Sequence, residues 1–160
     1  MKKLLNAVAI ICVFAGSLLA QTAGVRPTPA DSSLHPLFIK FQDVKWERMF
    51  PEMGDDSPEI TILRVDPKTQ ATQLMIRNPK AIHVLRHWHT ANETHTVLRG
   101  TIVFECDGKR EELEPGSFNY IPSKMIHQAW LPDGSLSFIT VDAAWDINWV
   151  DGPPQAPKKP

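Results

Sequence analysis

The sequence predicts an all-β domain, a sandwich or a barrel. Short runs rich in β-branched, aromatic and other apolar residues follow one another between residues 60 and 141, and little of the chain has a helical pattern. Turn residues separate these runs: Asp107-Gly108 marks a hairpin, and Pro115-Gly116 and Pro132-Asp133-Gly134 mark further turns. Many short strands at such spacing are typical of an all-β sandwich or barrel. In chain order the expected strands are Ile60–Val65, Ala71–Arg77, Ile82–His89, Thr94–Val97, Thr101–Cys106, Phe118–Ile121, Ile126–Leu131 and Leu136–Val141.

The first 20 residues have the pattern of a secretory signal peptide. Lys2 and Lys3 precede an apolar run from Leu4 to Phe14, and small residues follow up to Ala20. The apolar run is short for a membrane-spanning helix, and no basic stop-transfer flank follows it. We therefore expect cleavage near Ala20, no stable membrane anchor after processing, and an exported protein that is periplasmic or secreted.

Composition divides the rest of the chain into three parts. Residues 21–36 are rich in Pro, Ser, Thr and Ala and predict a linker or N-terminal arm. Residues 37–150 hold the predicted strands and form one domain. Residues 151–160 end in PPQAPKKP, which predicts a disordered C-terminal tail.

Charge and cysteine content exclude some classes of protein. The chain has 17 Lys and Arg against 18 Asp and Glu, so loss of Lys2 and Lys3 leaves 15 against 18, a formal charge of −3. No basic patch is evident, and we expect no nucleic-acid partner. Cys12 would leave with the signal peptide, so Cys106 remains alone and the fold must depend on its core rather than on a disulfide.

A histidine-rich segment predicts a metal site. His87, His89 and Glu93 have H-x-H-x3-E spacing and precede Gly100, and His127 follows Gly116 and Pro122 on a distant strand. Side chains at i and i+2 of a strand point to the same face, so His87 and His89 can reach one ion. Three imidazoles and a carboxylate suit one divalent ion, and Mn, Fe, Co, Ni, Cu and Zn all remain open.

Strand alternation indicates which other residues face this site. His83 and Leu85 should share the inner face with His87 and His89, and His95 and Val97 should follow Glu93 inward. Candidates for a substrate contact, or for a partner of a ligand's second ring nitrogen, are His95, Gln73, Tyr120 and Gln128. Walls formed by Met75, Leu85, Val97 and Phe104 would favour a small, partly apolar organic molecule.

These two segments resemble the two sequence motifs of the cupin superfamily. The first is HWHTANETHTVLRG, from His87 to Gly100, and the second runs from Gly116 through Pro122 to His127. His87, His89, Glu93 and His127 match the positions that carry the metal in cupins. The sequence departs from the motifs at turn or packing positions, with Ala81 and Lys124 in place of glycine and Leu131 in place of asparagine. The resemblance implies a small jelly-roll β-barrel (a double-stranded β-helix), often a homodimer through exchange of an N-terminal strand.

Two functions follow from such a site. Four protein ligands on a six-coordinate ion leave two adjacent positions for a bidentate substrate, or for a substrate oxygen with dioxygen or water. This favours a metal-dependent enzyme, a dioxygenase, isomerase or lyase, in which Glu93 is also a candidate general base. Alternatively, the barrel binds metal or a small ligand without turnover. Residues 49–66 and 73–77 resemble the region before the metal motif in cupin domains of ChrR-type anti-sigma factors, and a purely structural metal is a third reading.

Overall fold

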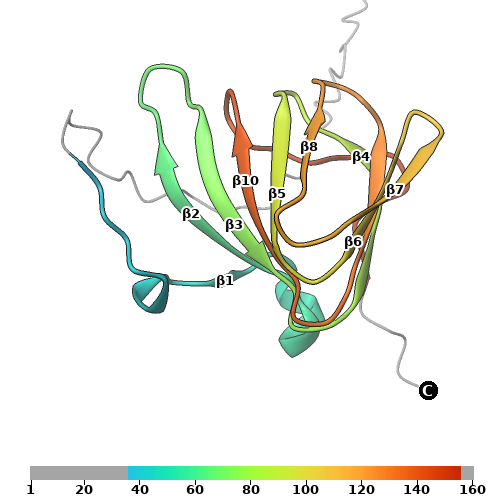
Figure 1. Cartoon of the computed structure of the whole chain (residues 1–160), viewed down its shortest axis with the longest axis horizontal. Helices are drawn as coiled ribbons and strands as arrows, with labels where there is room; N and C mark the ends of the chain where they lie inside the picture. The colour runs from blue at the N-terminus through green and yellow to red at the C-terminus, as the bar shows by residue number, and fades with distance from the viewer. Residues whose placement is uncertain (1–35, 156–160) are drawn as a thin grey trace, which may run out of the picture.

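The computed structural model describes residues 36–155, and the regular secondary structure of these residues is mostly strand (Figure 1). The predicted signal peptide at 1–20, nearly all of the predicted arm at 21–36 and the last five residues of the predicted tail lie outside the described residues. Two 3₁₀ helices, η1 (Phe41–Asp43) and η2 (Pro51–Asp56), lie near the start, and neither is long and apolar enough to cross a membrane. The strands are β1 (Glu47–Arg48), β2 (Glu59–Val65), β3 (Thr72–Arg77), β4 (Ile82–Trp88), β5 (Glu93–Arg99), β6 (Ile102–Cys106), β7 (Lys109–Leu113), β8 (Phe118–Ile121), β9 (His127–Leu131), β10 (Leu136–Val141) and β11 (Asn148–Trp149).

The strands form two antiparallel sheets. The order is β1-β2-β3-β10-β5-β8 in the six-stranded sheet and β11-β4-β9-β6-β7 in the five-stranded sheet. In Figure 1 the chain passes back and forth between the two sheets, so that strands distant in sequence, such as β3 and β10, lie side by side. This is the jelly-roll arrangement, and the predicted fold class is confirmed.

All the strands expected from the sequence are present, and three more are found. Two of these, β1 and β11, are two-residue edge strands. The third, β7, has the sequence KREEL, which lacks the alternation of apolar and polar residues that identifies a strand. It is positioned by its pairing with β6 across the predicted Asp107-Gly108 turn, whose φ angles of 51° and 71° suit a tight hairpin.

The inner faces of the two sheets bury two apolar clusters. One contains Met49, Phe50, Ile60, Leu74 and Ile139, against which Trp145, Ile147 and Trp149 pack from the segment before and within β11. The other contains Val97, Ile102, Phe104 and Ala129 from β5, β6 and β9. Trp145 and Trp149 thus close the space between the sheets. The metal-motif histidines lie in this interior.

A β-bulge in β4 changes which residues face inward. Val84 pairs with Ala129 of β9, but His87 pairs with His127, so three steps along β4 match two along β9. One extra residue reverses the alternation before His87. The expectation that His83 and Leu85 face the site is therefore wrong: Val84 lines the interior, and His83 stacks on Trp130 outside, with ring centroids 4.4 Å apart.

Gly100, which the first motif contains, is required by the close approach of two loops. Its φ is +81°, and a Cβ at this position would lie 3.0 Å from Ser135 Cβ and 3.3 Å from Ser135 Cα. We expect Gly100→Ala to lower the free energy of unfolding by about 2–3 kcal/mol, because strain and a backbone contact add. Urea unfolding measures it. Gly116→Ala is the matched control, since Gly116 has φ +90° but no atom within 4 Å of the added Cβ. Equal losses in the two variants would contradict the role of the contact.

Candidate metal centre

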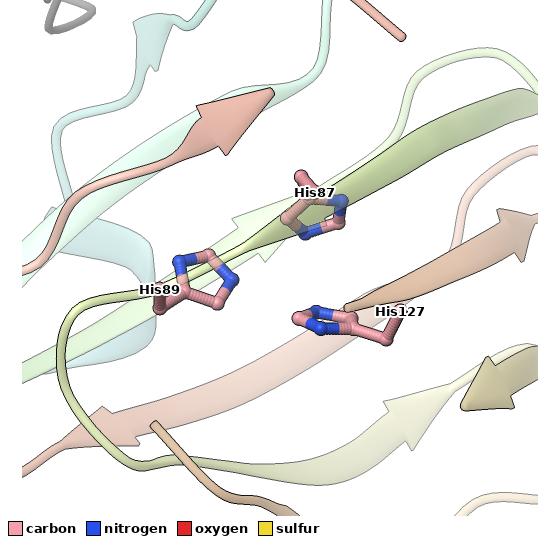
Figure 2. A group of neighbouring side chains, drawn as sticks. All are labelled: His87, His89 and His127. Atoms are coloured by element: carbon pink, nitrogen blue, oxygen red, sulfur yellow. The ribbon is translucent and has the colours of Figure 1, made fainter. Parts of the chain in front are cut away.

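Three buried histidines come together between the sheets. His87 lies near the end of β4, His89 follows just beyond it, and His127 begins β9 directly opposite His87. Their exposed fractions are only 5%, 4% and 2%. One ring nitrogen of each can be chosen so that all three lie within 4.8 Å of one another, and the rings face a common space in Figure 2. The cluster is compatible with a metal ion.

Backbone carbonyls orient each of the three rings. In each case Nδ1 contacts a carbonyl oxygen, which can only accept, so Nδ1 carries the hydrogen and donates it. The lone pair of each neutral ring is therefore on Nε2, the nitrogen left free for a ligand. The acceptors are Leu85 O for His87 at 2.7 Å, Met125 O for His127 at 3.0 Å, and Asp146 O for His89.

Burial keeps two of the histidines neutral. It lowers the pKa of His87 to about 3, with a further contribution from the nearby His127 and His89. It also lowers the pKa of His127 to about 4, although the charge of Glu93 and the bond to Met125 act in the opposite direction. Only neutral imidazole binds a metal, so these two rings need lose no proton to an incoming ion at neutral pH.

Glu93 lies beside this cluster, and its carboxylate is close to three imidazole rings. Its Oε2 is 3.0 Å from His89 Nε2, 3.6 Å from His95 Nε2 and 3.7 Å from His127 Nε2. Among residues 36–155, Glu93 Oε2 is a buried oxygen that has no hydrogen-bond partner. Burial opposes ionisation, but the surrounding imidazoles, His95 and His89 above all, hold the pKa of Glu93 below its usual range.

The environment of Glu93 fits a divalent ion. Burial acts to lower the pKa of His89, but the charge and closeness of Glu93, together with the bond to the Asp146 carbonyl and the charge of Asp146, outweigh burial and raise that pKa. Without an ion, the ionised carboxylate therefore depends on an imperfectly directed contact with His89. A cation next to Glu93 Oε2 and the three Nε2 atoms would satisfy all four groups. Glu93 lies outside the compact group of three histidines, so its predicted role as fourth ligand stays a prediction.

His95 reaches the same interior from β5, as the strand alternation predicted. It is buried, its Nδ1 lies 2.9 Å from Asn119 Oδ1, and its ring packs on Phe104. Because Asn119 Oδ1 accepts, the His95 lone pair lies on Nε2, toward Glu93, and burial lowers the pKa of this ring. The sequence did not indicate that Asn119 would contact His95. It faces His95 across the β5–β8 pairing, and only the register reveals it.

The other three polar candidates do not reach the site. Gln73 is exposed on the outer face of β3, because Leu74 on the opposite face takes the inward position. Tyr120 is 54% exposed, since Ile121 is the buried residue there. Gln128 alternates with the inward His127 and Ala129, and its amide bonds to His83 and Glu105 outside the barrel at 2.9 Å each. The prediction that these three residues contact a substrate or a ligand ring is therefore wrong.

A cavity of about 70 Å³ adjoins the histidines. The three histidines, Glu93 and His95 supply most of its polar lining, and most of the other lining residues are apolar. Of the four wall residues expected from the sequence, only Phe104 lines it. Met75 lies on the outer face of β3, Leu85 is displaced by the bulge, and Val97 packs in the second core cluster.

Asp146 connects the C-terminal segment to the metal loop. Its backbone carbonyl accepts from His89 Nδ1, and its carboxylate accepts from Thr90 N at 2.9 Å, Thr90 Oγ1 at 2.6 Å and Asn148 Nδ2 at 3.0 Å. These bonds fix the carbonyl that orients His89. No sequence pattern points to this residue, because it lies 57 positions after His89 in a segment without a motif.

We expect Asp146→Ala to weaken metal binding by about 10-fold. Alanine keeps the backbone carbonyl that accepts from His89 but loses the carboxylate bonds to Thr90 that hold this carbonyl in place, and the outer partners of a ligand imidazole typically contribute 10- to 100-fold to affinity. Competition with a chromophoric chelator measures the change. Asp142→Ala is the matched control: Asp142 accepts from Asn92 of the same loop but bonds to no histidine of the cluster. If the two variants lose the same affinity, general loosening of the loop rather than orientation of His89 explains the effect.

Fold and site together define a class: a small jelly-roll barrel with three buried histidines beside an apolar cavity. The family model described as a cupin domain matches residues 73–142, which include all the motif residues. The match identifies residues 73–142 as a cupin domain, and the fold agrees with it.

Solved structures resemble the chain at the level of the fold. An RmlC-like cupin from Shewanella frigidimarina has a TM-score of 0.57 and 19% identity, covering 69% of this chain and 93% of its own. A putative acetylacetone dioxygenase from Methylibium petroleiphilum has a TM-score of 0.60 and 14% identity, covering 79% and 90%. One chain from the crystal structures of DMSP lyases RdDddP and RnDddQII has a TM-score of 0.53 and 20% identity, covering 71% of this chain and 63% of its own. No curated protein matches the sequence significantly.

Proposed function

We propose that the protein is a metal-dependent enzyme, of oxygenase, isomerase or lyase type, that acts on a small organic molecule. The observation that carries this proposal is the orientation of three buried, carbonyl-anchored imidazoles with their Nε2 atoms toward one space beside an apolar cavity. A purely structural site has little use for an adjoining cavity, whereas a catalytic site needs room for a substrate. The dioxygenase and the lyases of the same fold are consistent with this proposal.

The protein residues have distinct roles in this proposal. His87, His89, His127 and Glu93 would hold the ion, which supplies a Lewis acid that polarises a carbonyl or enol oxygen. The apolar walls exclude water and so strengthen electrostatic interactions inside the cavity. Glu93 is ionised, buried and next to the ring nitrogens, so its Oε2 would be the atom placed to accept a proton from a substrate held beside the ion.

We also propose that the protein acts outside the cytoplasm as a homodimer. The signal-peptide pattern of residues 1–20 supports export. Four large apolar side chains on the segment before β1 support self-association: Leu37, Phe38, Ile39 and Phe41 are 44–91% exposed, and a second copy could cover them. Sedimentation of the processed chain tests the dimer, and a monomer at micromolar concentration would contradict it.

The alternative is a barrel that binds metal or a small ligand without turnover. The near-complete burial of the three histidines favours it, because a closed site holds an ion tightly and restricts access to it.

Elemental analysis of the protein purified from its own exported compartment separates these functions. Iron, manganese or copper, with oxygen consumption on addition of a diol or enol, supports the oxygenase. Tightly held zinc whose ligands do not change when small oxygen donors are added supports the non-catalytic barrel. A protein without bound metal that also fails to take up any of the six candidate ions contradicts both the enzyme and the metal-binding barrel, and leaves only a barrel that binds a small ligand without metal.

A further inference from the structure

We propose that the substrate of this site is a small organic molecule with a single negative charge, which binds the metal through two oxygens and buries an apolar remainder. This inference rests on the proposed function, because it takes a divalent ion at the three histidines as given. The size of the cavity indicates the size of the substrate, the charges around the cavity indicate its charge, and the apolar walls indicate its apolar part.

The size of the cavity favours a substrate of roughly five to seven non-hydrogen atoms. Its volume is about 70 Å³. A single water needs roughly 10–15 Å³ of such space, so the cavity holds the equivalent of about five to seven waters. Sugars, nucleotides and aromatic ring systems with side chains are too large. A short chelating acid, a hydroxy ketone or a small diketone fits.

The charges around the cavity limit the substrate to one negative charge. Among residues 36–155, no lysine or arginine lines the cavity. A divalent ion with three neutral imidazoles and the Glu93 carboxylate has a net charge of +1. One negative charge on the substrate completes the balance, whereas a second would be buried without a partner, at a high cost in free energy. Phosphorylated compounds and dicarboxylates are therefore disfavoured.

The walls next to the histidines receive the apolar remainder. Ala129 lies two residues beyond His127 on the same face of β9, and it pairs with Val84 on one side and with Phe104 on the other. All three line the cavity, and Ile139 and Ile147 also do so. Ala129 has the smallest side chain of this set, so the part of the cavity next to the three histidines has room for an apolar group.

Two chelating probes of equal size test the proposal. Pentane-2,4-dione and malonate have the same skeleton and chelate through two oxygens. The first binds as a monoanion with two methyl groups, and the second is a dianion with two further oxygens. Each is titrated into the full-length protein loaded with cobalt(II), whose visible absorption reports a change of ligands, and metal retention is checked after each titration. Affinities are expressed relative to those of the aqueous ion for the same probe.

We expect the loaded protein to favour pentane-2,4-dione over malonate by at least about 10-fold more than the aqueous ion does. Ala129→Leu fills the space beside the histidines and should abolish binding of pentane-2,4-dione while cobalt content stays unchanged. Ala81→Leu makes the same change in an exposed turn outside the cavity and should have no effect on either.

The results distinguish a wrong substrate class from a wrong metal site. A loaded protein that binds malonate as well as the aqueous ion does, or an Ala129→Leu variant that still binds the diketone, overturns the substrate class and leaves the metal site intact. A wild-type protein that takes up no cobalt overturns the proposed function, and this inference with it.

Discussion

Replacing His87 with alanine is expected to abolish stoichiometric metal binding. His87 supplies one of three buried Nε2 atoms, and its Nδ1 is already committed to Leu85 O, so no other side chain in the cluster can replace it. Losing a direct ligand should cost more than losing a group that merely orients one, and the affinity should fall by more than about 100-fold. Elemental analysis of the purified variant, with circular dichroism to show that the barrel is folded, measures the result.

His83→Ala is the matched control for this experiment. His83 lies on the same strand, four residues before His87, but the bulge places it outside, against Trp130 and Gln128. The variant should retain a full complement of metal. If His83→Ala loses metal as His87→Ala does, the inward face of β4 has been assigned incorrectly. If His87→Ala retains the metal, the ligand assignment itself is wrong.

Removing the metal is expected to lower the melting temperature by about 10 °C or more. Free ion at 1,000 times its Kd stabilises the folded state by about 4 kcal/mol, and for a domain of this size each kcal/mol shifts the melting temperature by roughly 3–4 °C. The ion would also stabilise the contact between the two sheets. His87 and His127 belong to the five-stranded sheet and Glu93 to the six-stranded sheet, so an ion held by all of them would connect the two sheets.

Differential scanning calorimetry before and after dialysis against a chelator measures this shift, and re-addition of the ion should restore the original transition. The chelated His87→Ala variant should not respond to added metal. An unchanged melting temperature in the wild type after complete metal removal would contradict a resident ion at this position.

Several features of this protein could be predicted because they depend on neighbouring residues. The strand runs from Ile60–Val65 to Leu136–Val141 follow from β-branched and aromatic residues between turn-forming ones, and every one of them is a strand in the structure. The Asp107-Gly108 hairpin follows from two residues that readily adopt positive φ. The two-residue spacing of His87 and His89 is likewise local, and the structure places both in the interior.

Other features depend on pairings between distant segments, and these could not be predicted. The bulge that turns His83 and Leu85 outward is a mismatch between β4 and β9, and neither strand shows it alone. The charged strand β7 forms only because β6 offers it an edge. Gln73, Tyr120 and Gln128 were assigned to the interior without a known register, and a shift of one residue moves a side chain to the opposite face.

By itself, then, the sequence determined the all-β class, the jelly-roll family and the residues that could ligate a metal. The tertiary structure decided which of those residues meet, which carbonyls orient them and how large a cavity they face. Asp146 and Asn119 illustrate the difference, since each touches a site histidine from a segment that has no metal motif. The physical reason is range. Periodicity and turn chemistry act over a few neighbouring residues, whereas register, burial and cavity shape arise from contacts between strands far apart in the chain.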